Sequence, residues 1–483
     1  MKLKDLLCGI DSEAVCGSLD TEVSGIEWDF IAVRPNDLFI YHCCAVNEKL
    51  CIAERAVRRG AAAIITDGEG SCTCMDGVTV IRVDTLDGLE HKLCLRFYGE
   101  YLRRMTLIGI TGTKGKTTTA YLISSMLRKA GHTVGLKTTI GVWTGKRFYE
   151  HDERWPHAYR MYEEMAENGI EILVAEFSSG DMWRAETDGL HFAACVYTNL
   201  YMDHVGDGEH PTFEDYREKK ALLFRDCDIA VINGDDSRIR EDVAQYTDRI
   251  ETFGMSEQCD LRCASFELTD DFGVRFRTEG TESFAAFLAH SGSYGIYNAL
   301  AAICVCRRYH VSRSIMCETM AELLVPGRME EIAYKEGVRV FVDYAHNGAS
   351  LEKVLLFLKS YRPKRLICLF GCGGNKPHLR RTDMGRASGQ LADLTVITTD
   401  NPRNEDPLAI IDDIKTAVEE VGGEYIVIPD RVEAIETVLA DAQRGDIILL
   451  AGKGHEQLQK TATGTIRMSD HSIAEKYITD QGT

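Results

Sequence analysis

The feature that most constrains this chain is a glycine-rich loop between an apolar run and an amphipathic stretch. The apolar run is Thr106–Ile110, and the loop Thr111-Gly-Thr-Lys-Gly-Lys-Thr-Thr-Thr119 follows it directly. Four apolar residues then recur at helical spacing: Leu122, Ile123, Met126 and Leu127. A strand that runs through such a loop into a helix is typical of a phosphate-binding site.

Each part of this loop has a use in binding a nucleotide. Glycines let backbone N–H groups approach phosphate oxygens, and the helix N-terminus adds its partial positive charge. We expect Lys116 to reach the terminal phosphates of ATP and Thr117 to ligate Mg²⁺. The loop is one residue longer than the strict Walker A pattern, because Gly109 lies six positions before Gly115. The residues expected to contact ATP are Gly112, Thr113, Lys114, Gly115, Lys116, Thr117 and Thr118.

The loop lies in the first of two series of short apolar runs that alternate with helical stretches. The first series contains Thr106–Ile110, Ile170–Phe177, Ala193–Thr198 and Ile229–Asn233. The second contains Val338–Tyr344, Leu366–Phe370, Leu394–Thr398, Tyr425–Ile428 and Ile447–Ala451. Such runs predict parallel strands joined by helical crossovers. The stretch Val325-Pro-Gly-Arg328 lies between the two series, and its proline and glycine favour a linker or hinge there.

At 483 residues the chain is long enough for several domains, since one domain takes roughly 100–200 residues. We predict an α/β fold with three domains. Residues 1–100 form a small mixed N-terminal domain, in which Asp37–Tyr41 and Ala62–Thr66 are strands and Ala53–Gly60 is helical. Residues 101–325 form a central P-loop domain with a parallel sheet, and residues 326–483 form a Rossmann-like C-terminal domain.

Composition excludes several classes of function. The formal net charge of -20 argues against binding to nucleic acid or to an anionic membrane surface, because phosphate contact needs surplus Lys and Arg. We find neither a secretory leader at Met1–Gly9 nor an apolar run long enough to span a membrane. The 17 cysteines include no Cys-x-x-Cys pair and are expected to be reduced thiols. We therefore expect a cytoplasmic protein, and a monomer as the simplest state.

Ten motifs recur in the order used by one enzyme family. They are Gly112–Thr117, Glu176-Phe-Ser-Ser179, Thr198-Asn-Leu-Tyr-Met-Asp-His204, Tyr216–Phe224, Asn233-Gly-Asp-Asp236, Pro326-Gly-Arg328, Asp343-Tyr-Ala-His346, Gly371-Cys-Gly-Gly374, Asp400-Asn-Pro-Arg403 and Gly452-Lys-Gly-His-Glu456. Their order and content resemble the Mur ligases, from about residue 103 to residue 460. The resemblance is strongest to the members that add the third residue of the peptidoglycan stem peptide.

The resemblance implies an ATP-dependent ligase that joins a carboxylate to an amine through an acyl phosphate. Such chemistry needs metal ligands beside the phosphate loop. Glu176 and His204 are expected to ligate Mg²⁺ together with Thr117. Lys220 resembles the lysine that is carbamylated in the family and helps to hold a second Mg²⁺, although the adjacent Lys219 leaves the register open by one residue. Lys116, Lys220, His204 and Glu176 are thus the predicted catalytic residues.

Further roles follow from the same resemblance. Asn298, Arg328 and Asp343 resemble residues that contact ATP or close over it. The Asp400-Asn-Pro-Arg403 motif accompanies meso-diaminopimelate in the family, whereas relatives that add lysine lack the arginine. Arg403 can form a bidentate pair with the distal carboxylate, and Glu456 can pair with the distal ammonium. The predicted substrate-binding residues are Ser178, Ser179, Arg184, Arg381, Asp400, Asn401, Pro402, Arg403, Gly452 and Glu456.

The acceptor-binding motifs of the family are poorly matched in this chain. Asp29-Phe-Ile31 stands where an Asp-Ser-Arg triplet is usual, Asn47-Glu-Lys49 replaces Asp-Gly-His, and Arg154-Trp-Pro156 replaces Thr-Thr-Pro. Gly180 stands where His or Gln is expected, and Glu186 where Arg is expected, with Arg184 two positions earlier. The preferred acceptor is still UDP-N-acetylmuramoyl-L-alanyl-D-glutamate, a UDP-linked muropeptide bound by the N-terminal domain, with a diamino acid as the amine.

Two alternatives remain open from the sequence. The chain could be a ligase of the same fold that acts on a non-wall carboxylate, such as a peptide natural product or a folate-like glutamate carrier. It could also be an inactive nucleotide-binding subunit. The presence of Lys116, Thr117, Glu176, His204 and Lys220 disfavours inactivity.

Overall fold

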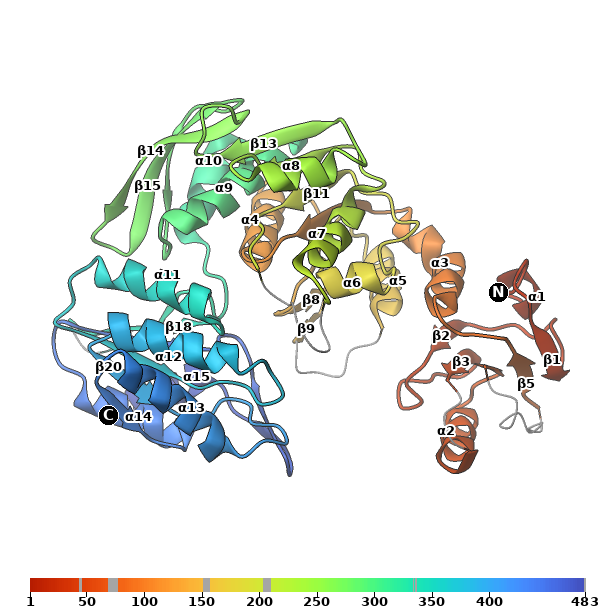
Figure 1. Ribbon diagram of the computed structural model, residues 1–483. Helices are drawn as coiled ribbons and strands as arrows, with labels where there is room; N and C mark the ends of the chain where they lie inside the picture. Colours follow the sequence, from red (N-terminus) through yellow and green to blue (C-terminus); the bar gives the residue numbers. More distant parts are fainter. Residues whose placement is uncertain are drawn as a thin grey trace.

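The chain folds around three sheets that follow one another in sequence and in space (Figure 1). This computed structural model describes residues 1–42, 46–67, 77–150, 157–202, 210–332, 334 and 337–481, with only the backbone of residues 46–51 and 481. The N-terminal sheet lies at one end, the central sheet in the middle and the C-terminal sheet at the other end.

The N-terminal unit is a five-stranded sheet with the order β1-β5-β4-β3-β2. Its strands are β1 (Glu13–Cys16), β2 (Gly25–Glu27), β3 (Asp37–Tyr41), β4 (Ala63–Thr66) and β5 (Thr79–Arg82). β2 to β5 are parallel, and β1 is antiparallel to β5. The helices are α1 (Leu3–Leu6), α2 (Val46–Arg58) and α3 (Leu89–Leu102), of which α3 leads into the central unit. The two predicted strands are confirmed as β3 and β4; the helix predicted at Ala53–Gly60 is confirmed in part, because α2 begins at Val46 and ends at Arg58.

The central sheet has eleven strands in the order β16-β15-β14-β13-β12-β11-β6-β10-β7-β8-β9. Their bounds are β6 (Thr106–Thr111), β7 (Val134–Lys137), β8 (Gly141–Trp143), β9 (Phe148–Glu150), β10 (Ile172–Glu176), β11 (Ala194–Tyr197), β12 (Ala230–Asn233), β13 (Ile250–Gly254), β14 (Leu261–Thr269), β15 (Gly273–Gly280) and β16 (Ala285–Leu288). The six strands β13, β12, β11, β6, β10 and β7 are parallel. Four of them, β6, β10, β11 and β12, confirm the first predicted series, whereas β7 and β13 were not predicted.

The antiparallel arm β14-β15-β16 was not among the predicted elements. β14 buries only its first residues and β15 alternates between buried and exposed residues, so polar and apolar residues mix along both strands. The predictions rested on continuous apolar runs, which arise only where both faces of a strand are buried.

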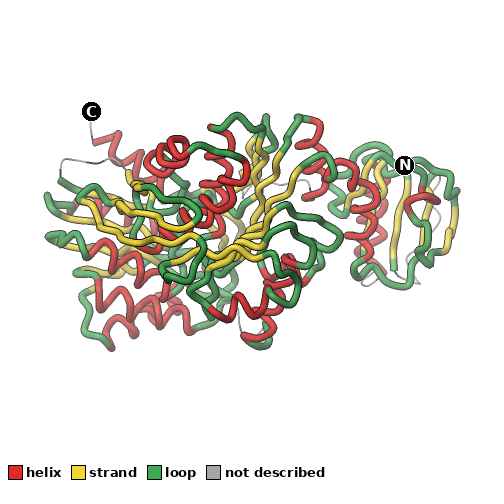
Figure 2. The backbone as a smooth tube through the Cα atoms, turned by 90° about the horizontal axis from the view of Figure 1, so that it is seen from above, coloured by secondary structure: helices red, strands yellow, loops and turns green. Residues whose placement is uncertain are grey.

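Helices cover both faces of the parallel part of this sheet (Figure 2). On one face, α4 (Lys116–Lys129) and α9 (Ser293–Cys306) pack on strand residues such as Ile108, Val174 and Val196. On the other face, α3, α5 (Ala158–Glu167) and α7 (Phe213–Ala221) pack on residues such as Leu173 and Tyr197. The remaining helices of this unit are α6 (Ser179–Trp183), α8 (Ser237–Val243), α10 (Arg313–Glu322) and the 3-10 turns η1 (Leu222–Phe224) and η2 (Arg307–Tyr309).

The C-terminal unit has a six-stranded sheet with the order β17-β18-β22-β19-β20-β21. The strands are β17 (Glu330–Ile332), β18 (Arg339–Asp343), β19 (Arg365–Phe370), β20 (Leu394–Ile397), β21 (Tyr425–Val427) and β22 (Asp446–Ala451). All but β17 are parallel, which confirms the second predicted series. A separate hairpin pairs β23 (Leu458–Thr461) with β24 (Gly464–Arg467).

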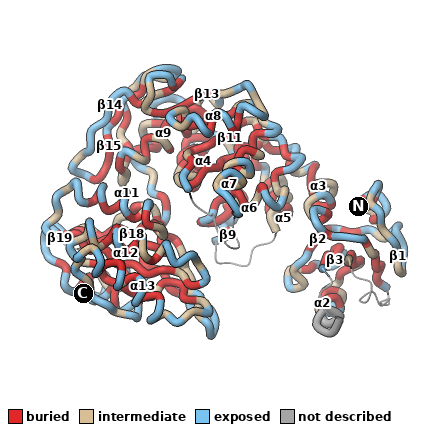
Figure 3. The backbone as a smooth tube through the Cα atoms, viewed as in Figure 1, coloured by how far each residue is buried: buried red, intermediate tan, exposed pale blue. Residues whose placement is uncertain are grey.

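Two layers of helices enclose the C-terminal sheet. Hydrophobic residues of α11 (Gly348–Lys359), α12 (Leu379–Leu391) and α13 (Pro407–Glu420) form one cluster, and those of α14 (Arg431–Asp441) and α15 (Asp470–Gln481) form the other. Figure 3 shows the buried backbone concentrated in the strands between such layers. No helix in the described ranges has both the length and the apolar character needed to cross a membrane.

Candidate active site

The phosphate loop joins β6 to α4, and two of its glycines lie where no side chain fits. A Cβ on Gly112 would lie 2.0 Å from Thr198 Oγ1, and a Cβ on Gly115 would lie 2.2 Å from Asn298 Oδ1. Both residues also have positive φ, 141° and 81°, which L side chains rarely adopt. The loop is therefore held tightly between the end of β11 and α9. This packing brings the predicted nucleotide contact Asn298 directly against the loop.

Two lysines from different helices converge on the loop. Lys116 Nζ, at the start of α4, donates to Gly112 O at 2.9 Å and Thr113 O at 3.2 Å. Lys220 Nζ, in α7, donates to Gly112 O at 3.0 Å and lies over the Tyr216 ring. The Lys220 side chain is almost completely buried, whereas Lys219 is partly exposed. The geometry therefore favours Lys220 over Lys219 as the family's modified lysine.

Oxygen ligands suitable for a divalent cation lie at the end of β10. Glu176 Oε2 accepts a hydrogen bond from Thr117 Oγ1 at 2.9 Å, and Glu176 Oε1 accepts one from the Thr139 amide. A carboxylate and a hydroxyl beside a phosphate loop are ligands that Mg²⁺ prefers. His204, predicted as a further ligand, lies outside the described residues. Within the described ranges, no group of three or more His, Cys, Asp or Glu side chains comes together as a metal site.

The predicted acceptor contacts lie around α6, one turn beyond Glu176. Ser178 is the N-cap of α6, where it forms a capping box with Asp181. Arg184, at the other end of the helix, pairs with Asp181 at 2.7 Å and Glu186 at 2.6 Å. Ser179, the first residue of α6, is 5% exposed. Arg154–Pro156 lie outside the described residues, as do the side chains of Asn47–Lys49.

Sequence reasoning missed a buried histidine beside Ser179. His210 Nε2 lies 2.8 Å from Ser179 Oγ, and His210 Nδ1 lies 2.5 Å from Asp215 Oδ2. The Asp215 carboxylate therefore fixes the imidazole in the orientation that meets the serine hydroxyl. The sequence offered one signal for this residue: His210 lies two positions before Thr212, which the structure shows to be the N-cap of α7.

The C-terminal unit brings further predicted residues to the carboxyl ends of its strands. Asp343, at the end of β18, accepts the amides of Met329 and Ala345, both at 2.8 Å. Burial raises the pKa of Asp343, and Arg328 opposes that shift. The Arg328 guanidinium lies 4.7 Å above the Tyr344 ring. Asp343 thus fixes the segment after the predicted hinge.

The two predicted amine-binding motifs meet at the ends of β20 and β22. Asn401 Nδ2 donates to Glu456 Oε2 at 2.8 Å, and Lys453 Nζ, fully buried, lies 3.1 Å from the same oxygen. A Cβ on Gly452 would lie 3.0 Å from Asp400 Oδ2. Burial raises the pKa of Asp400, and Lys453 opposes that shift. The structure therefore places a compact carboxylate–amide–ammonium group where the sequence predicted a diamino acid site.

Two predicted arginines behave differently in this region. Arg403 has φ +53° and donates from Nη1 to Gly374 O, while Pro402 O packs against Gly374. Arg381, 2% exposed, is paired with Glu405 at 2.6 Å and Asp413 at 2.9 Å. Arg381 would have to leave these ion pairs to bind a substrate carboxylate, so its ligand role stays a prediction.

Comparisons with known proteins agree with this architecture. The family model "Mur ligase middle domain" matches residues 110–306, and "Mur ligase, glutamate ligase domain" matches residues 327–454. A protein of Geobacillus thermodenitrificans named "UDP-N-acetylmuramoyl-L-alanyl-D-glutamate--2,6-diaminopimelate ligase" is 33% identical over 502 residues, covering 100% of both chains. A protein of the same name from Alkaliphilus metalliredigens is 33% identical, covering 100% of this chain and 98% of its own.

The chain belongs to the Mur ligase family.

Solved structures give the same result for the fold of this Mur ligase. A structure titled as the UDP-N-acetylmuramoyl-L-alanyl-D-glutamate–2,6-diaminopimelate ligase superposes with a TM-score of 0.64 at 26% identity, covering 100% of this chain and 99% of its own. MurF of Acinetobacter baumannii superposes with a TM-score of 0.70 at 16% identity, covering 99% of this chain and 98% of its own. The predicted α/β class and the predicted family are confirmed.

Proposed function

We propose that this Mur ligase joins an amine of 2,6-diaminopimelate, in its meso form, to the γ-carboxylate of UDP-N-acetylmuramoyl-L-alanyl-D-glutamate, using ATP and Mg²⁺. The full-length relatives named for this reaction support the proposal. The observation that carries it is the Asp400–Arg403 segment packed against Glu456 and Lys453, because this group offers paired charges to a diamino acid.

The reaction proceeds in two balanced steps. A carboxylate oxygen of the acceptor attacks the terminal phosphorus of ATP, so that ADP leaves and an acyl phosphate forms. The amine then attacks the acyl carbon, phosphate leaves, and the nitrogen loses a proton to give the amide. Both steps place negative charge near the phosphate loop, where fixed positive groups are most effective in a site that excludes water.

Residues at the loop supply these positive groups and orient the reactants. Lys116 and the N–H groups at the start of α4 neutralise the transferring phosphoryl group. Thr117, Glu176, His204 and a carbamylated Lys220 would hold Mg²⁺, and Asn298 would fix the loop against the nucleotide. Bound Mg²⁺ would supply Lewis acidity toward the phosphate oxygens. Arg328 and Asp343 would position the C-terminal unit over ATP.

The C-terminal unit would present the amine. Glu456 and Asn401 would bind the ammonium at the far end of the diamino acid, and Arg403 would bind its distal carboxylate. Asp400, Pro402 and Gly452 would shape the pocket through backbone contacts. To bind the distal carboxylate, Arg403 must break its hydrogen bond to Gly374 O. It would then form a charge-assisted pair with the carboxylate instead. The domain division at residues 100 and 325 is also part of this proposal, supported by the bounds of the three sheets.

Amine selectivity tests the proposal directly. With ATP and the UDP-linked acceptor, the wild-type protein should release ADP with diaminopimelate far faster than with lysine. Arg403→Ala should raise KM for diaminopimelate about 10- to 100-fold, because it removes a charge-assisted contact, while KM for ATP stays unchanged. Arg403→Lys serves as the matched control that keeps the charge. Equal use of both amines by wild type and Arg403→Ala would contradict the assignment.

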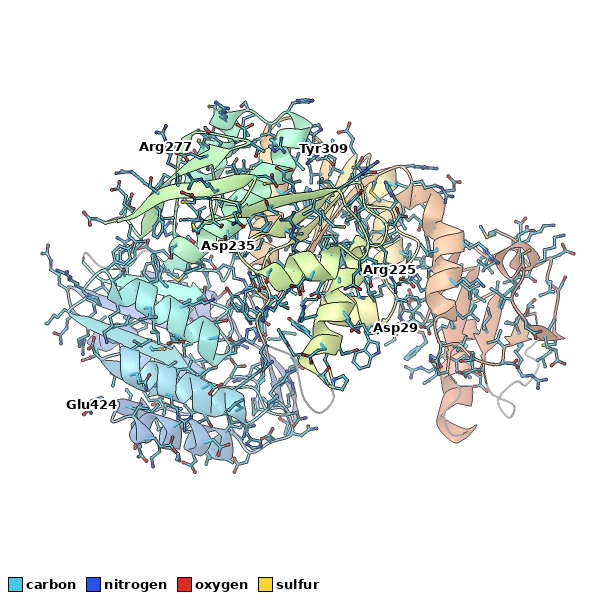
Figure 4. All side chains as sticks on the ribbon, turned by 45° about the horizontal axis from the view of Figure 1, so that its top comes forward. Asp29, Arg225, Asp235, Arg277, Tyr309 and Glu424 are labelled. Atoms are coloured by element: carbon cyan, nitrogen blue, oxygen red, sulfur yellow. The ribbon has the colours of Figure 1, made fainter. Side chains whose placement is uncertain are left out.

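A second acceptor class is worth testing because of the departures around residues 29–31. Asp29, which Figure 4 labels, lies on the side of the N-terminal unit that faces the central unit. Its Oδ1 accepts the amide of Ile31 and closes a local turn. A coupled ADP-release assay across UDP-muropeptides, folates and acidic peptides separates the two possibilities. Turnover with a non-wall carboxylate alone would replace the proposed acceptor while keeping the ligase chemistry.

A further inference from the structure

A lysine that neither the sequence motifs nor the proposed chemistry uses stands at the carboxyl end of β7. Lys137 is the last residue of that strand and pairs in register with Ala175, the residue before Glu176. Val134 and Leu136 of the same strand pack toward α4, whereas the Lys137 ammonium lies 4.8 Å from the Phe177 ring on the opposite face. Lys137 is thus close to the reaction centre but on the α6 side of the sheet, away from the helix of the phosphate loop.

The Lys137 ammonium interacts with the nearby carboxylates only at longer range. No described residue forms a hydrogen bond or an ion pair with its Nζ, and the side chain is only partly exposed. The nearby carboxylates are engaged elsewhere. Asp181 binds the Ser178 amide and Arg184, and Glu186 binds Arg184. Glu176 binds Thr117 and Thr139.

The lysine nevertheless remains an ammonium. Burial alone would lower the pKa of Lys137, yet the pKa is raised overall by its surroundings, which are Tyr162, Asp181, Glu186 and Glu176. Nearby negative charges therefore more than offset the desolvation of this ammonium, yet none of the described carboxylates forms a direct ion pair with it. Such a group is explained most simply by an anionic ligand that completes the pairing.

Given the proposed function, the position of Lys137 indicates which anionic group it would bind. The first turn of α5 contacts the N-terminal sheet, where His157 Nε2 donates to Ile26 O at 2.6 Å and Arg160 pairs with Asp37. One turn further, Tyr162 of the same helix lies beside Lys137. An acceptor that binds the N-terminal unit and reaches the phosphate loop must therefore pass along α5 and α6, where Lys137 stands.

We propose that Lys137 binds the carboxylate of the acceptor that does not react. The proposed acceptor ends in a glutamate with two carboxylates, and the reacting one must lie at the phosphate loop with Glu176 and Lys116. Lys137 lies on the other face of the sheet, where it can bind the second carboxylate. It acts as a specificity-determining residue, because an ammonium paired with a carboxylate in a half-buried site distinguishes an acidic terminus from its amide. This inference rests on the proposed function.

The test compares two acceptors that differ only at that carboxylate. One is UDP-N-acetylmuramoyl-L-alanyl-D-glutamate, and the other carries D-isoglutamine in place of D-glutamate, so that the α-carboxylate is a carboxamide and the reacting γ-carboxylate is unchanged. KM for each is measured by ADP release at saturating ATP and diaminopimelate. Wild type should show a KM about 10- to 100-fold higher for the carboxamide.

Lys137→Met should raise KM for the acid acceptor by the same factor and should no longer distinguish the two acceptors, while KM for ATP stays unchanged. Lys137→Arg should keep part of the preference. Lys146→Met is the matched control, because Lys146 is exposed in the neighbouring turn between β8 and β9. If Lys137→Met still prefers the acid acceptor as strongly as wild type does, the inference is overturned. If the wild type turns over neither acceptor, the proposed function itself fails, and the inference fails with it.

Discussion

At the scale of single residues, the site depends on short contacts to Glu176, and Thr117 is the most informative of them. Its Oγ1 donates to Glu176 at 2.9 Å and is also a predicted Mg²⁺ ligand. Thr117→Val keeps the shape but removes the hydroxyl. The Mg²⁺ concentration for half-maximal ADP release should rise about 10- to 100-fold, the range seen when ligands of a bound metal lose their support. Thr117→Ser, which keeps the hydroxyl, should stay near wild type; an unchanged Mg²⁺ dependence in Thr117→Val would remove Thr117 from the site.

Individual site residues could be predicted from the sequence where a function requires one residue type at a fixed spacing in a motif. Glycine at positions 112 and 115 follows from the backbone approach to phosphate, and the structure shows that no side chain fits at either position. Pairings between distant residues could not be predicted. The contacts of Arg381 with Asp413 and of Ser179 with His210 join segments about 30 residues apart, and nothing in local sequence fixes such distances.

At the scale of elements, one buried arginine joins the two strand ends that carry the amine site. Arg431, in the first turn of α14, binds Asp470 through two hydrogen bonds of 2.7 Å and donates to the carbonyls of Thr399 and Ala451. These carbonyls precede Asp400 and Gly452 directly. Arg431 and Asp470 are both fully buried, so neither charge can be satisfied by water if its partner is lost.

Arg431→Met should therefore destabilise the C-terminal unit by about 3–5 kcal/mol, the usual result of removing one partner from a buried pair. Chemical denaturation followed by circular dichroism measures the change. The double variant Arg431→Met/Asp470→Leu should recover part of the loss, because no unpaired charge remains. Arg386→Met is the control, since Arg386 pairs with Glu420 at the surface with side chains 48% and 49% exposed and should cost less than about 1 kcal/mol. Equal effects of both single variants would contradict the assigned role.

Many strands that are buried on both faces were predicted, although β7 and β13, which are also buried, were not. β6, β10 and β11 in the central sheet and β18, β19 and β22 in the C-terminal sheet are nearly continuous apolar runs. The antiparallel arm was missed because β14 buries only its first residues and β15 alternates. A largely exposed or alternating strand resembles a polar loop when only apolar runs are sought.

At the scale of the whole molecule, two partly buried histidines lie where the units meet. His157 connects the start of α5 to Ile26 in the N-terminal sheet, and its ring stacks on Trp28 with centroids 4.5 Å apart. His346 follows β18 and lies close enough to Lys114 of the phosphate loop to be influenced by its charge. The order of the three units was predictable from the motifs, but these contacts were not, since each one depends on how the units are oriented.

Acid should therefore weaken both junctions. Burial, reinforced by nearby cationic side chains, lowers the pKa of His157 from 6.5 to about 4 and that of His346 from 6.5 to about 3. Below pH 6.5 these histidines bind protons in the unfolded chain but not in the folded chain. Their contribution to the free energy of unfolding is therefore fully present above pH 6.5 and is lost as the pH approaches 4. The structure shows the reason for His157: its Nδ1 is buried, and no described group accepts the hydrogen bond that a protonated Nδ1 would have to donate.

Thermal unfolding between pH 7.5 and pH 5 measures this dependence. His157→Phe preserves the aromatic contact with Trp28 but cannot titrate, so its melting temperature should fall less steeply with acid than that of the wild type. Adding His346→Phe should flatten the dependence further, because the two histidines lie at separate junctions and their effects should add. An acid dependence as steep in the double variant as in the wild type would assign the loss of stability to carboxylates instead, and the junctions would then be insensitive to pH.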